Sequence, residues 1–204
     1  MDGTTKERVR IALRMQAGYT EQDDLLGQLI TQASAQVEAY LGRDLLAATK
    51  TEYHNLEGPE QRSLWLKSPP VSSVTSLAFD PASQWDGSES VYAADDYILN
   101  PDTGEMRFRF EPHVTVSDPA MGFRAWRVVY AGGLAASTSA LISAYPAIAA
   151  ACDLQVATLY HRSADPQTEQ RSFGGAAVKV SEPLGLCRAA REACGHHRLI
   201  RWRP

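Results

Sequence analysis

The sequence predicts an α+β fold, in which a small helical bundle carries a β-rich insertion. Three observations lead to this prediction. Residues 20–43 repeat their apolar side chains at helical spacing, residues 50–133 change to the alternating pattern of strands, and the helical spacing returns over 145–162. With 204 residues, 44% of them apolar and 22% charged, the chain is long enough to build a substantial core.

We therefore expect a single domain over residues 1–204 with three parts. The helical bundle should comprise 1–49 and 134–162, and the β-rich insertion should comprise 50–133. The remainder, 163–204, should form a linker, a short helix and a basic tail.

Two helices are predicted before the insertion. The first is a short helix over 4–17, in which Thr4 and Glu7 have the spacing of a capping box and Gly18 ends the helix. Its apolar stripe is correspondingly short, with Val9, Ala12 and Leu13.

The second helix, over 21–41, is the strongest element of the sequence. Thr20 is placed to cap it, and Asp23 stands where the reciprocal acid of a capping box is found. Gly42 supplies the left-handed residue that ends the helix. A single apolar stripe at helical spacing consists of Leu25, Leu26, Leu29, Ile30, Ala33, Val37, Tyr40 and Leu41.

Strands are predicted from about residue 50 onward, where the pattern becomes alternating. The segments expected to be strands lie around Thr51 and Tyr53 and at 63–67, 73–79, 96–100, 105–110 and 124–131. The residues Pro101 to Gly104 have the chemistry of a hairpin turn between two of these strands. Residues 80–95 are polar and poor in strand-forming side chains, which predicts a long loop.

The chain after Leu134 is predicted to be mainly helical. The helix over 145–162 tolerates Pro146 in its first turn, and its apolar stripe consists of Ile148, Cys152, Val156, Leu159 and Tyr160. A polar linker over 163–175, a short strand from Ala177, a short helix over 184–194 and a basic tail over 196–204 should follow.

Charge is unevenly distributed along the chain, although its formal net charge is only −4. From Asp80 to Asp118 there are nine acids and two arginines, a net charge of −7. From Gly185 to Pro204 there are five arginines and one acid, a net charge of +4 with neutral histidines. Such asymmetry indicates either surfaces for different partners or two solvated faces.

Composition also bounds the location of the protein. No apolar run is long enough to cross a bilayer, and arginines interrupt the apolar residues of the N-terminal segment. We therefore expect a cytosolic protein with no membrane partner. Three cysteines, an odd number, argue against a disulfide framework.

The sequence contains no motif of a catalytic, nucleotide-binding or zinc-protease site, so we predict no catalytic residues and no cofactor. One cluster has metal-ligating residue types, but its spacing fits no standard zinc module, and we expect buried thiols rather than a metal site: Cys187, Cys194, His196 and His197. Asp95 and Asp96 are expected to serve a turn or a sheet edge. The aromatic residues of the strands are expected to pack in the sheet: Tyr53, Trp65, Trp126 and Tyr130.

Four segments, taken in order, carry a family resemblance. They are the helix 23–43 with Asp44-Leu45-Leu46, the segment 69–80 with the pattern PPV-x-x-V, the hairpin 94–108 with the pattern DY…G, and 128–134 with the pattern Y-x-x-G before the helix 145–162. In this order they resemble the head–tail connector (adaptor) proteins of tailed phages. The resemblance covers most of residues 20–162, and the segment from Pro183 resembles the short helix and basic tail that often end the family.

The resemblance implies a structural protein of the virion. Such proteins form a ring, typically of twelve subunits, beneath the portal, where they extend the DNA channel and present a platform for the stopper or tail. The implied partners are copies of the chain itself, the portal protein, a stopper or tail-completion protein, and the genomic DNA that passes through the channel. The implied location is the head–tail neck, and the host cytoplasm during assembly.

Two surfaces are the candidate sites for this assembly. The basic C-terminal segment is expected to dock on the portal through Arg188, Arg191, Arg198, Arg201, Trp202 and Arg203. The acidic hairpin is expected to lie at subunit contacts through Asp96, Glu105, Arg107 and Arg109. Three alternatives stay open: a DNA-binding module that uses the arginine-rich tail, a stopper or tail-terminator ring protein, and an enzyme whose site is assembled from scattered residues.

Overall fold

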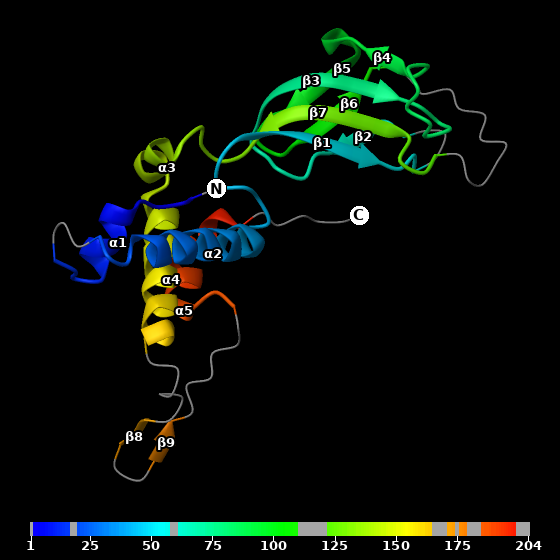
Figure 1. Cartoon of the computed structure of the whole chain (residues 1–204). Coiled ribbons are helices and arrows are strands. Elements are labelled where there is room, and N and C mark those ends of the chain that lie inside the picture. The colour runs from blue at the N-terminus through cyan, green and yellow to red at the C-terminus, as the bar shows by residue number, and fades with distance from the viewer. Residues whose placement is uncertain are drawn as a thin grey trace. The chain divides into compact units, whose positions relative to one another are not determined.

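The computed structural model confirms the α+β fold and divides the chain into two compact units (Figure 1). The helical unit contains the chain up to Leu46 and from Ala135 onward, and the β unit is Ala47–Leu134. The structure describes residues 2–16, 20–57, 61–109, 122–164, 171–173, 176–178 and 185–198.

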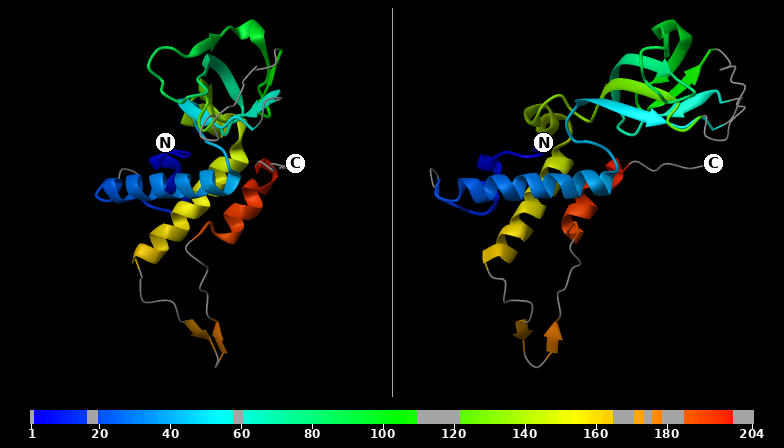
Figure 2. Two further views of the ribbon diagram at one scale, coloured as in Figure 1. Left: turned by 90° about the vertical axis from the view of Figure 1, so that its right-hand side faces the viewer. Right: turned by 45° about the vertical axis from the view of Figure 1, so that its right-hand side comes forward.

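The helical unit is built around its two longest helices, α2 (Asp23–Leu41) and α4 (Pro146–Ala164). They cross in contact with one another, and α4 also contacts α1 (Lys6–Ala12), α3 (Thr138–Ala144) and α5 (Arg188–Cys194) (Figures 1 and 2). The apolar stripe predicted for α2 faces this contact. The core on this side consists of Val9, Leu26, Leu29, Ile30, Ala33 and Val156.

Both capping boxes predicted for the N-terminal helices are wrong. The cap of α1 is Thr5, whose hydroxyl accepts from the Arg8 N–H at 3.4 Å, while the buried Thr4 donates its hydroxyl to Asp153 on α4. The cap of α2 is Gln22, which makes no side-chain cap, and Asp23 instead pairs with Arg10 of α1. Thr4 and Asp23 therefore make tertiary contacts to α4 and α1 in place of the expected capping hydrogen bonds.

Gly42 ends α2 as predicted. Its φ of 69° lies in the left-handed region, and its N–H donates to the Glu38 carbonyl at 2.9 Å. Helix α1 is shorter than the predicted 4–17, and Gly18, expected to end it, lies outside the described residues.

The chain after Leu134 contains one helix that was not predicted. Helix α3 is capped by Ser137, whose hydroxyl accepts from the Ala140 N–H at 3.2 Å. Among the described residues no single helix is long and apolar enough to span a membrane, and only α3 and α4 together, bent by 114° where they meet, have the length and composition. The apolar side of α4 is in the core of the helical unit, with Ile148, Ala149, Ala151, Cys152 and Val156 all buried.

The C-terminal part contains a short antiparallel hairpin of β8 (Arg171–Phe173) and β9 (Ala176–Val178), followed by α5 and the 3-10 turn η2 (Gly195–His197). The strand predicted from Ala177 thus exists as β9, but part of the predicted linker is the strand β8. The predicted helix 184–194 is α5, which begins only at Arg188.

The β unit contains two antiparallel sheets. The first has the order β1-β7-β3-β4, with β1 at Ala48–His54, β7 at Trp126–Gly132, β3 at Val71–Phe79 and β4 at Ser90–Tyr92. The second has the order β2-β6-β5, with β2 at Ser63–Trp65, β6 at Glu105–Phe108 and β5 at Tyr97–Asn100. Side chains of both sheets share one core, consisting of Leu64, Leu66, Val71, Leu77, Phe79, Met106, Phe108, Ala125, Trp126, Val128 and Tyr130.

Trp126 is the centre of this core. Its ring is fully buried, stacks on Phe108 at 4.5 Å between centroids and lies 4.4 Å from Phe79. Its indole N–H donates to Gln61 at 3.2 Å, so the polar atom of the ring is satisfied. The sheet-packing role expected for Trp126 is confirmed.

The predicted loop 80–95 is more ordered than expected. It contains β4 and the 3-10 turn η1 (Ala94–Asp96). The buried carboxylate of Asp80 accepts from the backbone N–H groups of Ala82, Gln84 and Trp85 at 2.6–2.9 Å, which fixes the start of the loop. A side chain that satisfies three backbone donors takes the place of a regular element here.

Candidate assembly surfaces

The outward face of the three-stranded sheet is the first candidate surface. In the register of this sheet Ser63, Arg107 and Ile98 are directly opposite one another, and so are Trp65, Glu105 and Asn100. Because alternate residues of a strand point to opposite faces, these six side chains share one face, while the buried row of Leu64, Met106 and Leu99 faces the core.

Two of the four hairpin residues predicted at subunit contacts lie on this face. Glu105 and Arg107 form an ion pair at 2.7 Å, in which the Arg107 side chain is 69% exposed. The hydrogen bond and the negative charge of Glu105 raise the pKa of Arg107. Arg107 is therefore available at the surface, while its partner Glu105 is only 17% exposed.

The other two predicted residues, Asp96 and Arg109, lie beside the face and serve the hairpin locally. Asp96 belongs to η1, where its carboxylate accepts from the Ala93 N–H at 2.7 Å. Its carbonyl accepts from the Arg109 N–H at 2.9 Å. The turn role expected for Asp96 is confirmed.

Two exposed apolar side chains on the same face were not predicted as functional. Trp65 is 50% exposed and Ile98 is 55% exposed, on either side of the Glu105–Arg107 pair. The sheet-packing role expected for Trp65 is therefore wrong. The sequence did contain a signal, because Leu64, Trp65 and Leu66 are consecutive and cannot all face the same side of a strand.

The second candidate surface is the basic C-terminal segment, which a buried amide holds on the helical unit. The side chain of Gln155 on α4 is 1% exposed. Its NH₂ donates to the Gln36 side chain at 2.6 Å and to the Gly185 carbonyl at 3.4 Å, and its oxygen accepts from the Cys187 N–H at 2.7 Å. Sequence periodicity does not distinguish Gln155 from other polar residues, so this buried attachment of the C-terminal segment was not predicted.

Three of the six residues predicted to dock on the portal lie in the described part of this segment. Arg188 is exposed and pairs with Glu192 at 2.8 Å. Arg191 is exposed on the same helix, and the Arg198 guanidinium lies 5.3 Å from the centre of the Tyr40 ring. Arg201, Trp202 and Arg203 lie outside the described residues.

The thiols near this segment are buried, as predicted. Cys152, Cys187 and Cys194 are all free and buried, and Cys194 donates to the Ala190 carbonyl at 3.0 Å. Burial, with help from the nearby Asp153, raises the pKa of Cys152 to about 12. The described residues contain no cluster of histidine, cysteine and acidic side chains that could hold a metal.

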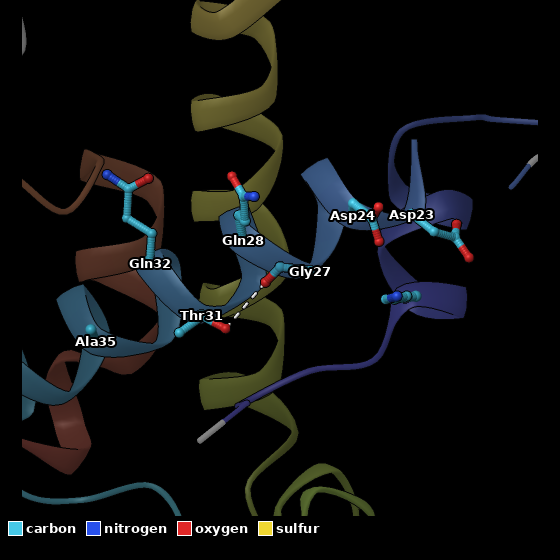
Figure 3. Close-up of a pocket in the computed structure, with 8 residues that line it drawn as sticks. Asp23, Asp24, Gly27, Gln28, Thr31, Gln32 and Ala35 are labelled. Carbon is cyan, nitrogen blue, oxygen red and sulfur yellow. Dashed lines mark hydrogen bonds between the residues drawn. The ribbon is translucent and has the colours of Figure 1, made fainter. Parts of the chain in front are cut away.

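A third surface, a shallow groove, lies over the N-terminal half of α2 (Figure 3). It has a volume of about 740 Å³ and is lined by Lys6, Asp23, Asp24, Gly27, Gln28, Thr31, Gln32 and Ala35. In the floor of the groove, Gly27 has no side chain, and Thr31 donates its hydroxyl to the Gly27 carbonyl at 3.1 Å. No sequence pattern had marked this groove.

The outer face of the four-stranded sheet combines arginine with aromatic rings. The Arg124 guanidinium lies 4.1 Å from the centre of the Tyr53 ring, and the Arg127 guanidinium lies 4.7 Å from that of Trp85. Arg127 also pairs with Glu89 at 2.5 Å. The prediction that Tyr53 simply packs in the sheet is incomplete, since its ring supports a cation.

Comparison with known proteins gives the same fold in particle necks. No protein-family model and no curated protein sequence matches this chain. It is similar to a chain in the neck of an empty GTA particle computed with C6 symmetry, with 22% identity and a TM-score of 0.61 over 96% of this chain and 89% of that chain. Similar chains occur in the virion of a native gene transfer agent (GTA) particle, with 21% identity, a TM-score of 0.61 and the same coverage, and in the neck of a native GTA particle computed with C12 symmetry, with 20% identity and a TM-score of 0.59 over 96% of this chain and 91% of that chain. At these identities the likeness establishes the fold.

Proposed function

We propose that this chain is a structural protein of the neck of a tailed phage or a related particle, where copies of it form a ring that joins head to tail. The single observation that carries the proposal is the shared fold with chains in GTA necks, which extends over 96% of this chain. The order of four sequence segments, which resembles head–tail connector proteins, supports the same role independently.

A ring of about twelve copies fits the symmetry of the similar structures, since necks computed with C6 and C12 symmetry both accommodate it. Ring formation requires two different surfaces on each copy that fit one another. The described residues offer candidates for these surfaces, among them the sheet face around Trp65 and Ile98 and the groove over α2. An assembly role also accounts for a sequence without catalytic motifs.

In this proposal the ring lies beneath the portal, extends the DNA channel and presents a platform for a stopper or tail-completion protein. The tail from Arg198 onward docks on the portal, with Arg201, Trp202 and Arg203 as its contact residues. Tryptophan and arginine are the residues most enriched at binding hot spots, and guanidinium groups pair with carboxylates in two-point geometry. Arg188 and Arg191 belong to the same basic segment, but α5 holds them on the helical unit.

The proposal is tested by removing the gene from the particle that carries it. Heads should still assemble and fill with DNA, but electron micrographs should show them without tails, because the joining ring is missing. Supplying the intact gene in trans should restore tailed particles. Normal tailed particles in the absence of the gene would contradict a neck function, and empty heads alone would indicate a role in packaging.

A further inference from the structure

The solvent-facing side of α2 is almost free of charge. Its exposed residues are Asp24, Gln28, Thr31, Gln32, Ala35 and Ala39, of which only Asp24 is charged. Depletion of charged residues is a feature of the cores of protein interfaces. This side of the helix includes the floor of the groove seen in Figure 3.

At one end of this groove, an exposed carboxylate has no partner among the described residues. Asp23 is paired with Arg10, and Lys6 lies over Gly27 with its Cε 3.7 Å from the position of an added Cβ. Asp24 is exposed at the same end and, within the described residues, makes no side-chain hydrogen bond or ion pair.

Helix α5 carries an exposed guanidinium group that has no partner among the described residues. Arg191 is exposed on α5 and, within the described part of the chain, its guanidinium has no partner, whereas Arg188 is paired with Glu192. Helix α5 also exposes the small Ala189. The helix has a fixed position, because Gln155 holds its start and Cys194 is buried at its end.

These two charges cannot meet within one copy. Helix α5 is attached beside the C-terminal half of α2, through the Gln155–Gln36 hydrogen bond and the contact of Arg198 with Tyr40. Gln36 lies about 18 Å from Asp24 along the axis of α2, at a rise of 1.5 Å per residue. That separation exceeds the reach of a direct ion pair and the screening length of about 8 Å at physiological salt.

We propose that the groove over α2 receives helix α5 of a second copy of this chain, with Arg191 of one copy paired to Asp24 of the next. The opposite charges of Asp24 and Arg191 are complementary, and Ala189, the small exposed residue of α5, allows the helix to approach the groove closely. A contact between two different surfaces is head-to-tail and repeats from copy to copy, and it gives a ring when the rotation between neighbouring copies closes. The inference rests on the proposed function, since it assigns the subunit contact of the proposed ring.

A charge exchange tests this contact with the full-length protein, assembled with the portal and measured by mass photometry. Asp24→Arg and Arg191→Asp should each raise the concentration needed for half-maximal assembly about tenfold, because like charges then face one another at every contact. The matched control for Asp24→Arg is Glu57→Arg, which makes the same change of charge at an exposed acid of the β unit. Circular dichroism should show that all three variants keep the native helix content.

Mixing the two single variants gives the decisive result. In a 1:1 mixture the two variants can alternate around the ring, so that opposite charges face one another at every contact. One contact then joins the introduced arginine to the introduced aspartate, and the next keeps the original pair of Asp24 and Arg191. Assembly should therefore return to within about twofold of the unaltered protein.

Three outcomes would overturn the inference and leave the proposed function in place. They are rings that form as well with either variant alone as with the unaltered protein, a mixture without recovery, and association that stops at a dimer. Failure of the unaltered protein to assemble would overturn both proposals.

Discussion

Tyr130 donates its hydroxyl to the carboxylate of Glu52 across the strands β1 and β7, inside the β unit. The two residues are diagonal neighbours on one face of the sheet, because Glu52 pairs with Val128 and Tyr130 lies two residues further along β7. Glu52 also accepts from the Lys67 N–H at 3.2 Å and lies 3.1 Å from the ring of His54, and Tyr130 accepts from the Ser68 N–H at 3.1 Å. We call this group of contacts the polar junction. It connects the turn before β3, at Lys67 and Ser68, to strands β1 and β7.

Because of the polar junction, the free energy of unfolding of the β unit should depend on pH in the acid range. Burial alone would raise the pKa of Glu52, but the neighbouring His54 ring, the hydrogen bond from Tyr130 and the Lys67 N–H together lower it. A carboxyl whose pKa is lower in the folded state stabilises the fold above its unfolded pKa of about 4.3. This stabilisation is lost as the pH falls through the lower, folded value.

Glu52→Gln should therefore lower the free energy of unfolding by about 1–3 kcal/mol at pH 7, because the buried donors lose their carboxylate acceptor. The loss should become smaller as the pH falls from the unfolded pKa of about 4.3 toward the lower folded pKa, below which Glu52 is protonated in both states. Denaturant unfolding followed by tryptophan fluorescence measures both effects, because Trp126 is buried in this unit. Glu57→Gln, at an exposed acid, is the control and should change neither quantity; equal effects of the two substitutions would contradict the role of the junction.

Two glycines of the helical unit should respond to alanine in opposite directions. A Cβ on Gly3 would lie 2.7 Å from both the Cys152 sulfur and a Leu45 methyl carbon, so Gly3→Ala should destabilise the unit by about 1–3 kcal/mol. Gly27 is in the second turn of α2 with only Lys6 nearby, at 3.7 Å, so Gly27→Ala should stabilise the helix by about 0.5–1 kcal/mol. Thermal unfolding followed by circular dichroism gives both signs, and a stable Gly3→Ala protein would show that the N-terminal segment is not packed as described.

Gln155 should control the attachment of α5. Gln155→Ala removes the acceptor of the Cys187 N–H and the donors to Gln36 and Gly185, so α5 should separate from α4 more often. Labelling with a thiol reagent should then accelerate at Cys187 and Cys194 at least about tenfold, as opening of the local structure exposes them. Cys152 serves as the internal control because its sulfur also lies beside Gly3 and Leu45, which do not belong to α5, and equal acceleration at all three thiols would indicate general unfolding instead.

The face of the three-stranded sheet should contribute to assembly through its apolar residues. Trp65→Ser should weaken ring formation while leaving the unfolding transition almost unchanged, since the ring of Trp65 is half exposed in the single copy. Asp96→Lys should behave differently and cost about 1 kcal/mol of stability, because the carboxylate accepts from the Ala93 N–H. Sedimentation velocity and thermal unfolding separate the two effects, and a Trp65→Ser protein that assembles normally would exclude this face from the subunit contact.

The basic tail should be needed for docking and dispensable for folding. Deleting residues 196–204 removes Arg198, Arg201 and Arg203, and should abolish portal binding while circular dichroism stays unchanged. Unchanged affinity for the portal would contradict the docking role. If the shortened protein binds the portal but particles lose DNA, the arginines face the channel, and the salt dependence of DNA binding should then decrease in proportion to the charges removed.

The long helices could be predicted because their signals are local. Gly42 ends α2 and the stripe that includes Leu26 and Ile30 fixes its buried side, and neither depends on distant parts of the chain. The capping boxes failed for the opposite reason. The hydroxyl of Thr4 is used by Asp153, far away in sequence, and Asp23 is used by Arg10, so long-range partners decided what looked like local chemistry.

The candidate surfaces were only partly predictable. Charge patterning drew attention to Arg107 and Arg191, which are exposed because charged side chains are rarely buried, but their roles in assembly stay predictions. The exposure of Trp65 depends on the register between β2 and β6, and the groove over α2 depends on where α1 packs. Such features follow from tertiary structure, and composition or periodicity cannot reveal them.

The most direct test of the account is to image the purified protein with the portal ring of its own particle by cryo-electron microscopy. We predict a second ring of about twelve copies stacked on one face of the portal, coaxial with the channel and with the Asp24 end of each copy beside α5 of the next. Free portal rings beside monomeric protein, at concentrations where the portal itself is intact, would contradict the proposed function.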